Sequence, residues 1–224
     1  MDRRITLWDT ANGAVVQQWV PHDRVREVYA LKLAFSPNGR YLASSAWGID
    51  RRTVIWDLSG PLHRVLKGHA DTVTLCIWSP QGDVIASGSE DATVRIWDAD
   101  TFLPLHVLQH AADSTIELIQ FSPDGCWLLT GCYPSSHYIW DVASGTGRLL
   151  RMFVDPRFAG NPIAATFNPD GTKLAIASPG GVVEILAIEG NECQSGVVLR
   201  GGTRNLLGRE TSHIMFSPDR KSVV

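Results

Sequence analysis

The chain has 224 residues, of which 44% are hydrophobic, and it carries a formal net charge of −3 at pH 7. This length fits one all-β domain, and the near-balanced charge argues against a general attraction to nucleic acid or membranes. No apolar run approaches the roughly 18 residues of a membrane span, and residues 1–8 lack the apolar core of a signal peptide. We therefore expect an intracellular protein, cytoplasmic or nuclear, that does not contact a membrane.

Residues 1–20 are predicted to supply the last two strands of a repeating unit. Asp2 and Trp8 are six residues apart, a step that recurs in a later unit. The β-branched stretch 15–20 that follows is typical of a strand.

Residues 21–67 are predicted to form the next unit, which carries two insertions. His22, Ser44, Asp50 and Trp56 stand at the positions of a histidine, a hydroxyl, a carboxylate and a tryptophan that recur in the following unit. The second insertion, residues 46–50, is expected to form a turn.

Residues 68–109 are the most regular unit, with predicted strands over 72–78, 84–87 and 93–97. Between the first two lies a turn of the Ser-Pro-x-Gly type, in which proline presets φ and glycine suits the fourth position. Four polar side chains from separate elements are expected to form one hydrogen-bonded chain if they are buried. They are His69, Ser87, Asp91 and Trp97.

The later units depart progressively from this pattern. Residues 110–154 keep His110, Thr130 and Trp140, but Pro134 stands where the carboxylate is expected. Residues 155–200 keep the turn and the strand pattern, but Leu186 replaces the tryptophan; the stretch 189–195 is expected to be a loop. Residues 201–224 are predicted to begin a further unit.

The period of the units points to a known architecture. The turn prolines at 37, 80, 123, 169 and 218 are 43, 43, 46 and 49 residues apart, close to the roughly 40–45 residues of a four-stranded propeller blade. Together with the His…Ser…Asp…Trp-Asp spacing, this repeat resembles the WD-repeat (WD40) β-propeller family. The resemblance implies that the four recurring residues form the family's structural tetrad.

The fold expected from this resemblance is all-β, a single β-propeller domain over residues 1–224 with four-stranded antiparallel blades. About five repeats are expected, as four complete blades and two half-blades. Two arrangements are open. The chain closes as a five-bladed ring through its two half-blades, which removes exposed strand edges, or it is a piece of a propeller with about seven blades.

The resemblance also implies a rigid, non-catalytic scaffold or adaptor that binds proteins or peptides through its rim and loops. We expect no enzymatic activity, cofactor, metal or small-molecule substrate, and we do not expect nucleic acid as the partner. The two insertions in residues 21–67 and matching loop positions in the later units predict a protein-binding rim. Its candidate residues are Arg24, Arg26, Trp47, Arg51, Arg52, Asp71, Glu90, Asp113 and Tyr133.

Two other functions are weighed against the scaffold. Arginines on the rim could recognise a phosphorylated peptide or a nucleic acid, although the net charge does not favour this. His69, Ser87 and Asp91 also have the composition of a hydrolase triad, but no Gly-x-Ser-x-Gly elbow accompanies them.

The cysteines Cys76, Cys126, Cys132 and Cys193 show no metal-ligand spacing. They are interpreted as small buried hydrophobic residues in a reducing compartment.

Overall fold

The computed structural model describes residues 4–19, 30–47, 51–133, 136–152, 164–178, 182–189, 192–200 and 214–217. Within these ranges the chain is all-β and its sheets are antiparallel. A two-stranded sheet pairs β1 (Ile5–Trp8) with β2 (Val15–Trp19). Four four-stranded sheets follow, so the predicted all-β fold of four-stranded blades is confirmed.

Each four-stranded sheet is a meander of consecutive strands. The first contains β3 (Ala30–Phe35), β4 (Tyr41–Trp47), β5 (Thr53–Asp57) and β6 (His63–Leu66). The second contains β7 (Val73–Trp78), β8 (Val84–Ser89), β9 (Thr93–Asp98) and β10 (Pro104–Gln109). The third contains β11 (Thr115–Phe121), β12 (Trp127–Tyr133), β13 (Ser136–Asp141) and β14 (Gly147–Met152). The fourth contains β15 (Ala165–Phe167), β16 (Lys173–Ser178), β17 (Val182–Glu189) and β18 (Glu192–Arg200).

The turn between β7 and β8 shows how the sequence sets these hairpins. The Gly82 N–H donates to the carbonyl of Ser79, and Gly82 has a φ of 78°, a left-handed conformation that suits glycine. Ser79 Oγ accepts the N–H of Val84 and donates to the Asp83 carboxylate. The same Ser-Pro-x-Gly turn joins β3 to β4 and β11 to β12, so one local signal starts three hairpins.

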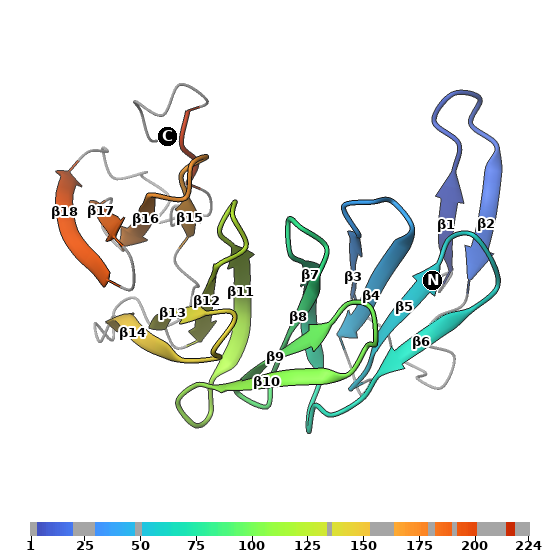
Figure 1. Cartoon of the computed structure of the whole chain (residues 1–224), viewed down its shortest axis with the longest axis horizontal. Helices are drawn as coiled ribbons and strands as arrows, with labels where there is room; N and C mark the ends of the chain where they lie inside the picture. Colours follow the sequence, from blue (N-terminus) through green and yellow to red (C-terminus); the bar gives the residue numbers. More distant parts are fainter. Residues whose placement is uncertain are drawn as a thin grey trace, which may run out of the picture.

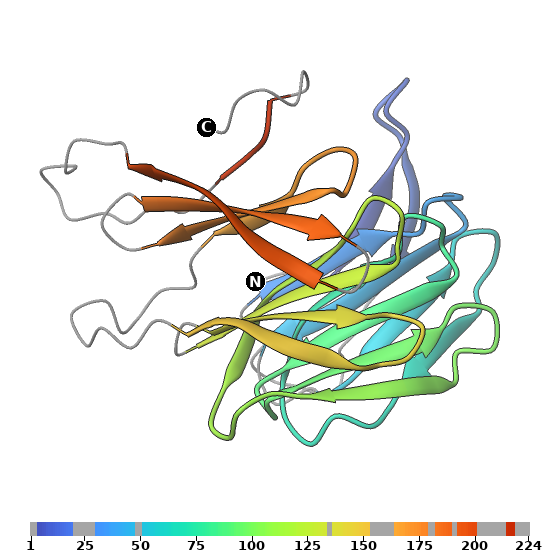
Figure 2. The ribbon, with the colours of Figure 1, turned by 60° about the vertical axis from the view of Figure 1, so that its left-hand side comes forward.

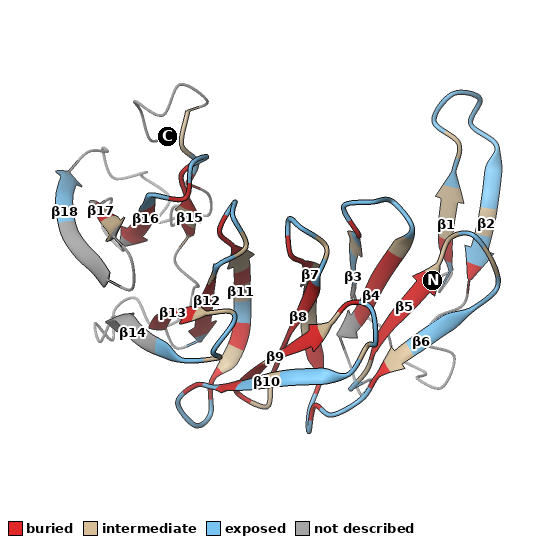
Figure 3. Cartoon of the chain, in the orientation of Figure 1, coloured by how far each residue is buried: buried red, intermediate tan, exposed pale blue. Residues whose placement is uncertain are grey.

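The sheets stand side by side along an arc, with β1–β2 at one end and β15–β18 at the other (Figure 1). Because consecutive strands are antiparallel, the connecting turns gather at two ends of the sheets, as the turned view of Figure 2 shows. Burial falls from the middle strands toward the outer ones: β8 is buried throughout, whereas much of β10 is exposed (Figure 3).

Apolar side chains fill the seams between neighbouring sheets. One buried cluster joins the second and third four-stranded sheets through Val94, Ile96, Ile116 and Leu128. Three further clusters occupy the other seams between adjacent sheets. Since burying one such side chain stabilises a fold by about 1.5–3 kcal/mol, these seams hold the sheets against each other.

Three local predictions are wrong. The stretch 189–195, expected to be a loop, contains the start of β18, whose Glu192 pairs with Glu189 of β17. Its polar composition is compatible with a strand because pairing to β17 satisfies the backbone at an outer edge. Residues 46 and 47, expected in a turn, extend β4, where Trp47 pairs with Ala30.

The third concerns the cysteines. Cys76 and Cys132 are buried as expected, but Cys126 is exposed. It lies in the turn before β12, where its N–H donates to the Asp124 carboxylate, so its side chain is outside the packed sheet. Cys193 lies among residues whose side chains the structure does not describe.

Candidate functional site

The second four-stranded sheet brings His69, Ser87, Asp91 and Trp97 together. The Trp97 indole N–H donates to Ser87 Oγ over 2.9 Å, and Ser87 Oγ lies 2.8 Å from His69 Nε2. His69 Nδ1 lies 3.0 Å from an Asp91 carboxylate oxygen. An ionised carboxylate can only accept, so Nδ1 carries the proton and Ser87 donates to Nε2. The four groups therefore form one continuous donor chain from the indole to the carboxylate.

Asp91 is the anionic end of this chain. Burial disfavours its charge, but hydrogen bonds from His69, the Thr93 hydroxyl and the Ala70 N–H outweigh that cost and lower the pKa of its carboxyl group. The loop before β7, the turn before β9 and strand β8 are tied together by these contacts. Thr93 was not among the predicted residues; its place two residues after the aspartate, where a hydroxyl can close an Asx-type turn, is the signal that marks it.

The order Ser87–His69–Asp91 matches that of a hydrolase triad, but the surroundings differ. Ser87 is 0% exposed and Trp97 is 2% exposed, so a substrate carbonyl has no path to the serine oxygen. The indole also donates to the oxygen that would attack. This arrangement uses the three groups to satisfy one another inside the sheet.

Only part of the corresponding set in the β3–β6 sheet is described. Trp56 donates its indole N–H to Ser44 Oγ over 3.0 Å, and both side chains are buried. His22 and Asp50, the other two predicted members, lie outside the described residues.

The β11–β14 sheet contains the tryptophan, the hydroxyl and the histidine of the same hydrogen-bonded series. No carboxylate is among its described members. Trp140 donates to Thr130 Oγ1 over 2.8 Å, and His110 Nε2 lies 2.7 Å from the same oxygen. His110 Nδ1 is buried and has no hydrogen-bond partner. The ring instead packs edge-on to Tyr138, with 4.7 Å between the ring centroids. Burial lowers the pKa of His110 to about 4, which keeps the ring neutral at pH 7.

The predicted rim lies at one end of the sheets, in the loops that precede each sheet or join its middle strands. Asp71 and Glu90 come together there: the Glu90 N–H donates to the carbonyl of Thr72, and Ser89 Oγ donates to the carbonyl of Asp71. The Asp71 side chain is exposed, whereas that of Glu90 is half-buried.

The other described rim residues occupy neighbouring loops at the same end. Asp113 is exposed with a φ of 60°, and Tyr133, at the end of β12, is 40% exposed. Arg51 is exposed and Arg52 is half-buried. Trp47 is placed by its backbone in β4, but its side chain is not described. Arg24 and Arg26 lie outside the described residues.

Two kinds of feature are absent from the described ranges. No group of three or more His, Cys, Asp or Glu side chains there is arranged to hold a metal ion. Across the same residues, no helix has the length and apolar character needed to cross a membrane.

Comparison with known proteins identifies the repeat. The family model described as WD domain, G-beta repeat, matches residues 13–57, 60–98 and 102–141, together more than half of the chain. The chain belongs to the WD-repeat family. Propellers of this family are in general non-catalytic platforms for other proteins.

Solved structures support the same fold. A chain in the crystal structure of a mitotic checkpoint complex matches this WD-repeat protein with a TM-score of 0.69 over 99% of its length, at 19% identity. The match covers 64% of that chain. This likeness concerns the β-propeller fold alone. A search of curated proteins finds no match to the sequence.

Proposed function

We propose that this WD-repeat protein is a non-catalytic adaptor that binds protein or peptide partners through the rim defined by Arg51, Asp71, Asp113 and Tyr133. The observation that carries the proposal is that these four side chains are exposed at one end of the first three four-stranded sheets, in the loops that precede or interrupt those sheets. The buried polar groups of the Trp97–Ser87–His69–Asp91 series, by contrast, bond to one another within the second four-stranded sheet. A rigid scaffold that offers its loops to a ligand is a common way to position a binding surface.

The composition of the rim favours a protein partner over an anionic one. Asp71 and Asp113 add negative charge to the same end of the sheets as Arg51, and the exposed phenol of Tyr133 is a side chain enriched at protein interfaces. Recognition of a phosphorylated peptide or nucleic acid through the arginines is the alternative. Binding that weakens steeply with salt would favour it.

The test is affinity purification with the wild-type chain and with a rim variant that combines Asp71→Asn, Asp113→Asn and Tyr133→Ala. A partner identified by mass spectrometry is then purified and its affinity measured by calorimetry. We expect the rim variant to bind at least tenfold more weakly, about 1.4 kcal/mol, with an unchanged melting temperature. Equal affinity for both chains would contradict the rim, and labelling of Ser87 by a fluorophosphonate would contradict a non-catalytic role.

A further inference from the structure

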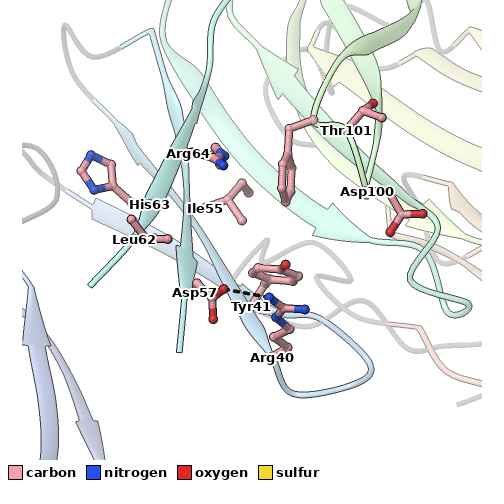
Figure 4. Close-up of a pocket in the computed structure, with 10 residues that line it drawn as sticks. Arg40, Tyr41, Ile55, Asp57, Leu62, His63, Arg64, Asp100 and Thr101 are labelled. Atoms are coloured by element: carbon pink, nitrogen blue, oxygen red, sulfur yellow. Dashed lines mark hydrogen bonds and ion pairs between the residues drawn. The ribbon is translucent and has the colours of Figure 1, made fainter. Parts of the chain in front are cut away.

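A pocket of about 260 Å³ lies at the end of the sheets opposite the rim, in the seam between the first two four-stranded sheets (Figure 4). Three turns and the adjoining strand ends form it. Arg40 and Tyr41 lie at the junction of the β3–β4 turn with β4, Leu62 lies in the β5–β6 turn and Phe102 in the β9–β10 turn. Arg64 of β6 also lines the pocket. None of these residues belongs to the predicted rim or to a tetrad.

Phe102 adopts an unusual backbone conformation in this pocket. Its φ is 60°, and its N–H donates to the carbonyl of Asp98. In the β1–β2 turn and the β13–β14 turn, the residue whose N–H donates to the corresponding aspartate carbonyl is a glycine. These residues are Gly13, with a φ of 70°, and Gly145, with a φ of 67°. A bulky aromatic residue in the left-handed region is strained, whereas glycine is not. Such strain tends to persist where the side chain serves a function.

The Phe102 ring extends a row of aromatic side chains. It packs edge-on to Tyr41, with 5.7 Å between centroids and an interplanar angle of 86°. Tyr41 in turn stacks on Trp78 at 5.9 Å and 9°. The row forms an apolar wall, and Leu62, which is 64% exposed, lies at the pocket as well. An apolar side chain of a ligand could therefore be covered on two sides.

In the seam between the second and third four-stranded sheets, side chains of the protein itself fill the corresponding position. His106, paired with Ile96, lies against the following turn, where its Nε2 is 3.0 Å from the carbonyl of Ala143. A Cβ on Gly145 would lie 2.6 Å from the His106 ring, so no side chain fits there. The residue that matches His106 in the first four-stranded sheet is Arg64, paired with Ile55. The pocket therefore differs from the corresponding position in the next seam at two residues. Arg64 stands where that seam has His106, and Phe102 stands where it has Gly145.

The charges at the pocket select the ligand further. Arg40 lies over the Tyr41 ring, 4.9 Å from its centroid, and pairs with the Asp57 carboxylate at 3.2 Å, as the dashed line in Figure 4 shows. The Arg64 side chain is exposed and makes no hydrogen bond or ion pair with the described part of the chain. Asp100 lies in the turn between β9 and β10, away from Arg64 (Figure 4). A carboxylate of the ligand is thus expected on the Arg64 side, where a charge-assisted bond can form.

We propose that this pocket binds a short acidic segment of a partner protein, with an aliphatic or aromatic side chain against Phe102, Tyr41 and Leu62 and a neighbouring carboxylate on Arg64. The choice of a protein ligand rests on the proposed adaptor function, but the site is separate from the rim. It gives the protein a second docking position, directed to the opposite end of the sheets.

The test uses an array of fluorescein-labelled eight-residue peptides that combine one Glu or Asp with one Leu, Val or Phe in a Gly-Ser background. Fluorescence polarisation is measured against the wild-type chain, and each acidic peptide has a Gln- or Asn-containing match. We expect acidic peptides to bind at least tenfold more tightly than their amide matches. Arg64→Gln and Phe102→Gly should each weaken this binding tenfold or more.

Lys173→Gln, at an exposed lysine of the fourth four-stranded sheet and outside both the rim and the pocket, is the control and should leave peptide binding unchanged. The melting temperature separates a lost contact from a lost fold; if Phe102→Gly unfolds the chain, Leu62→Ser replaces it. The proposal is overturned if no acidic peptide binds, if the amide peptides bind equally well, or if a labelled single-stranded RNA binds more tightly and depends on Arg64. Loss of binding on Arg51→Gln but not on Arg64→Gln also overturns it and assigns the peptide to the rim. A failed adaptor function is recognised separately, by the rim variant and its purified partner.

Discussion

Trp97 donates its indole N–H to the hydroxyl oxygen of Ser87 across 2.9 Å, and neither side chain is more than 2% exposed. The serine links strands β8 and β9 to the histidine of the preceding loop. This single oxygen joins two buried partners, Trp97 and His69. Its removal is therefore expected to cost more than an ordinary surface hydrogen bond.

Ser87→Ala is expected to lower the free energy of unfolding by about 1–3 kcal/mol, because the Trp97 N–H and His69 Nε2 both lose a buried partner. Urea unfolding followed by tryptophan fluorescence measures the change. Ser144→Ala, at an exposed serine, is the control and should cost less. Equal costs for the two variants would mean that the buried chain does not contribute to stability.

Asp91 is expected to make the fold sensitive to acid. Its carboxyl pKa is lower in the folded chain than in the unfolded one, so the unfolded state binds the proton more readily. Its contribution to stability is present above about pH 4, near the unfolded pKa, and is lost as the pH falls below it. Asp91→Asn should therefore reduce stability at pH 7 and flatten the loss below pH 4. If the free energy of unfolding of the variant fell with decreasing pH as steeply as that of the wild type, this role would be contradicted.

His110 should act in a different pH window. The lowered pKa of about 4 means that the folded ring resists a proton that the unfolded chain accepts from about pH 6.5 downward. Stability is thus retained above pH 6.5 and falls as the pH decreases toward 4, by up to roughly 3 kcal/mol. His110→Gln should remove this slope. Chemical denaturation at half-unit pH steps compares the two chains, and parallel curves would refute the assignment.

Gly88 in β8 packs closely against β11 of the third four-stranded sheet. A Cβ at this position would lie 2.6 Å from Ile116 Cγ2 and 2.9 Å from Ile119 Cδ1. Gly88→Ala is therefore expected to destabilise the fold by about 1–3 kcal/mol through overpacking. Gly60→Ala is the matched control, since nothing lies within 4 Å of its Cβ. Thermal unfolding of both variants tests the seam; a neutral Gly88→Ala would show that the sheets can shift apart.

The repeat was predictable from sequence because its signals are local. The Ser-Pro-x-Gly turn, the alternating strands and the Trp-Asp pairs each act within a few residues, and together they specify the four-stranded sheets. Spacing was also sufficient to select His69, Ser87, Asp91 and Trp97 from different elements. By contrast, the replacement of a carboxylate by the Tyr138 ring beside His110 depends on which side chain faces the histidine across the sheet.

The two wrong strand predictions also depend on the partner that lies across the sheet. The polar start of β18 is a strand because it pairs with β17, and Trp47 is in β4 because β3 is long enough to pair with it. The pocket beside Phe102 was not predicted, since it depends on three turns from two sheets. A phenylalanine at the position of Gly13 and Gly145 was the available signal, visible only once the turns are aligned.

Because each described apolar cluster joins a sheet only to its neighbour, the molecule resembles a row of coupled units more than one undivided globule. In such a row, stability is close to a sum of unit and nearest-neighbour terms. A sheet flanked on both sides should open less often than one flanked on a single side. Amide hydrogen exchange is therefore expected to be slowest in β8, β9 and β12 and faster in β1 and β2. A substitution that weakens one seam should leave the amides of distant sheets protected from exchange.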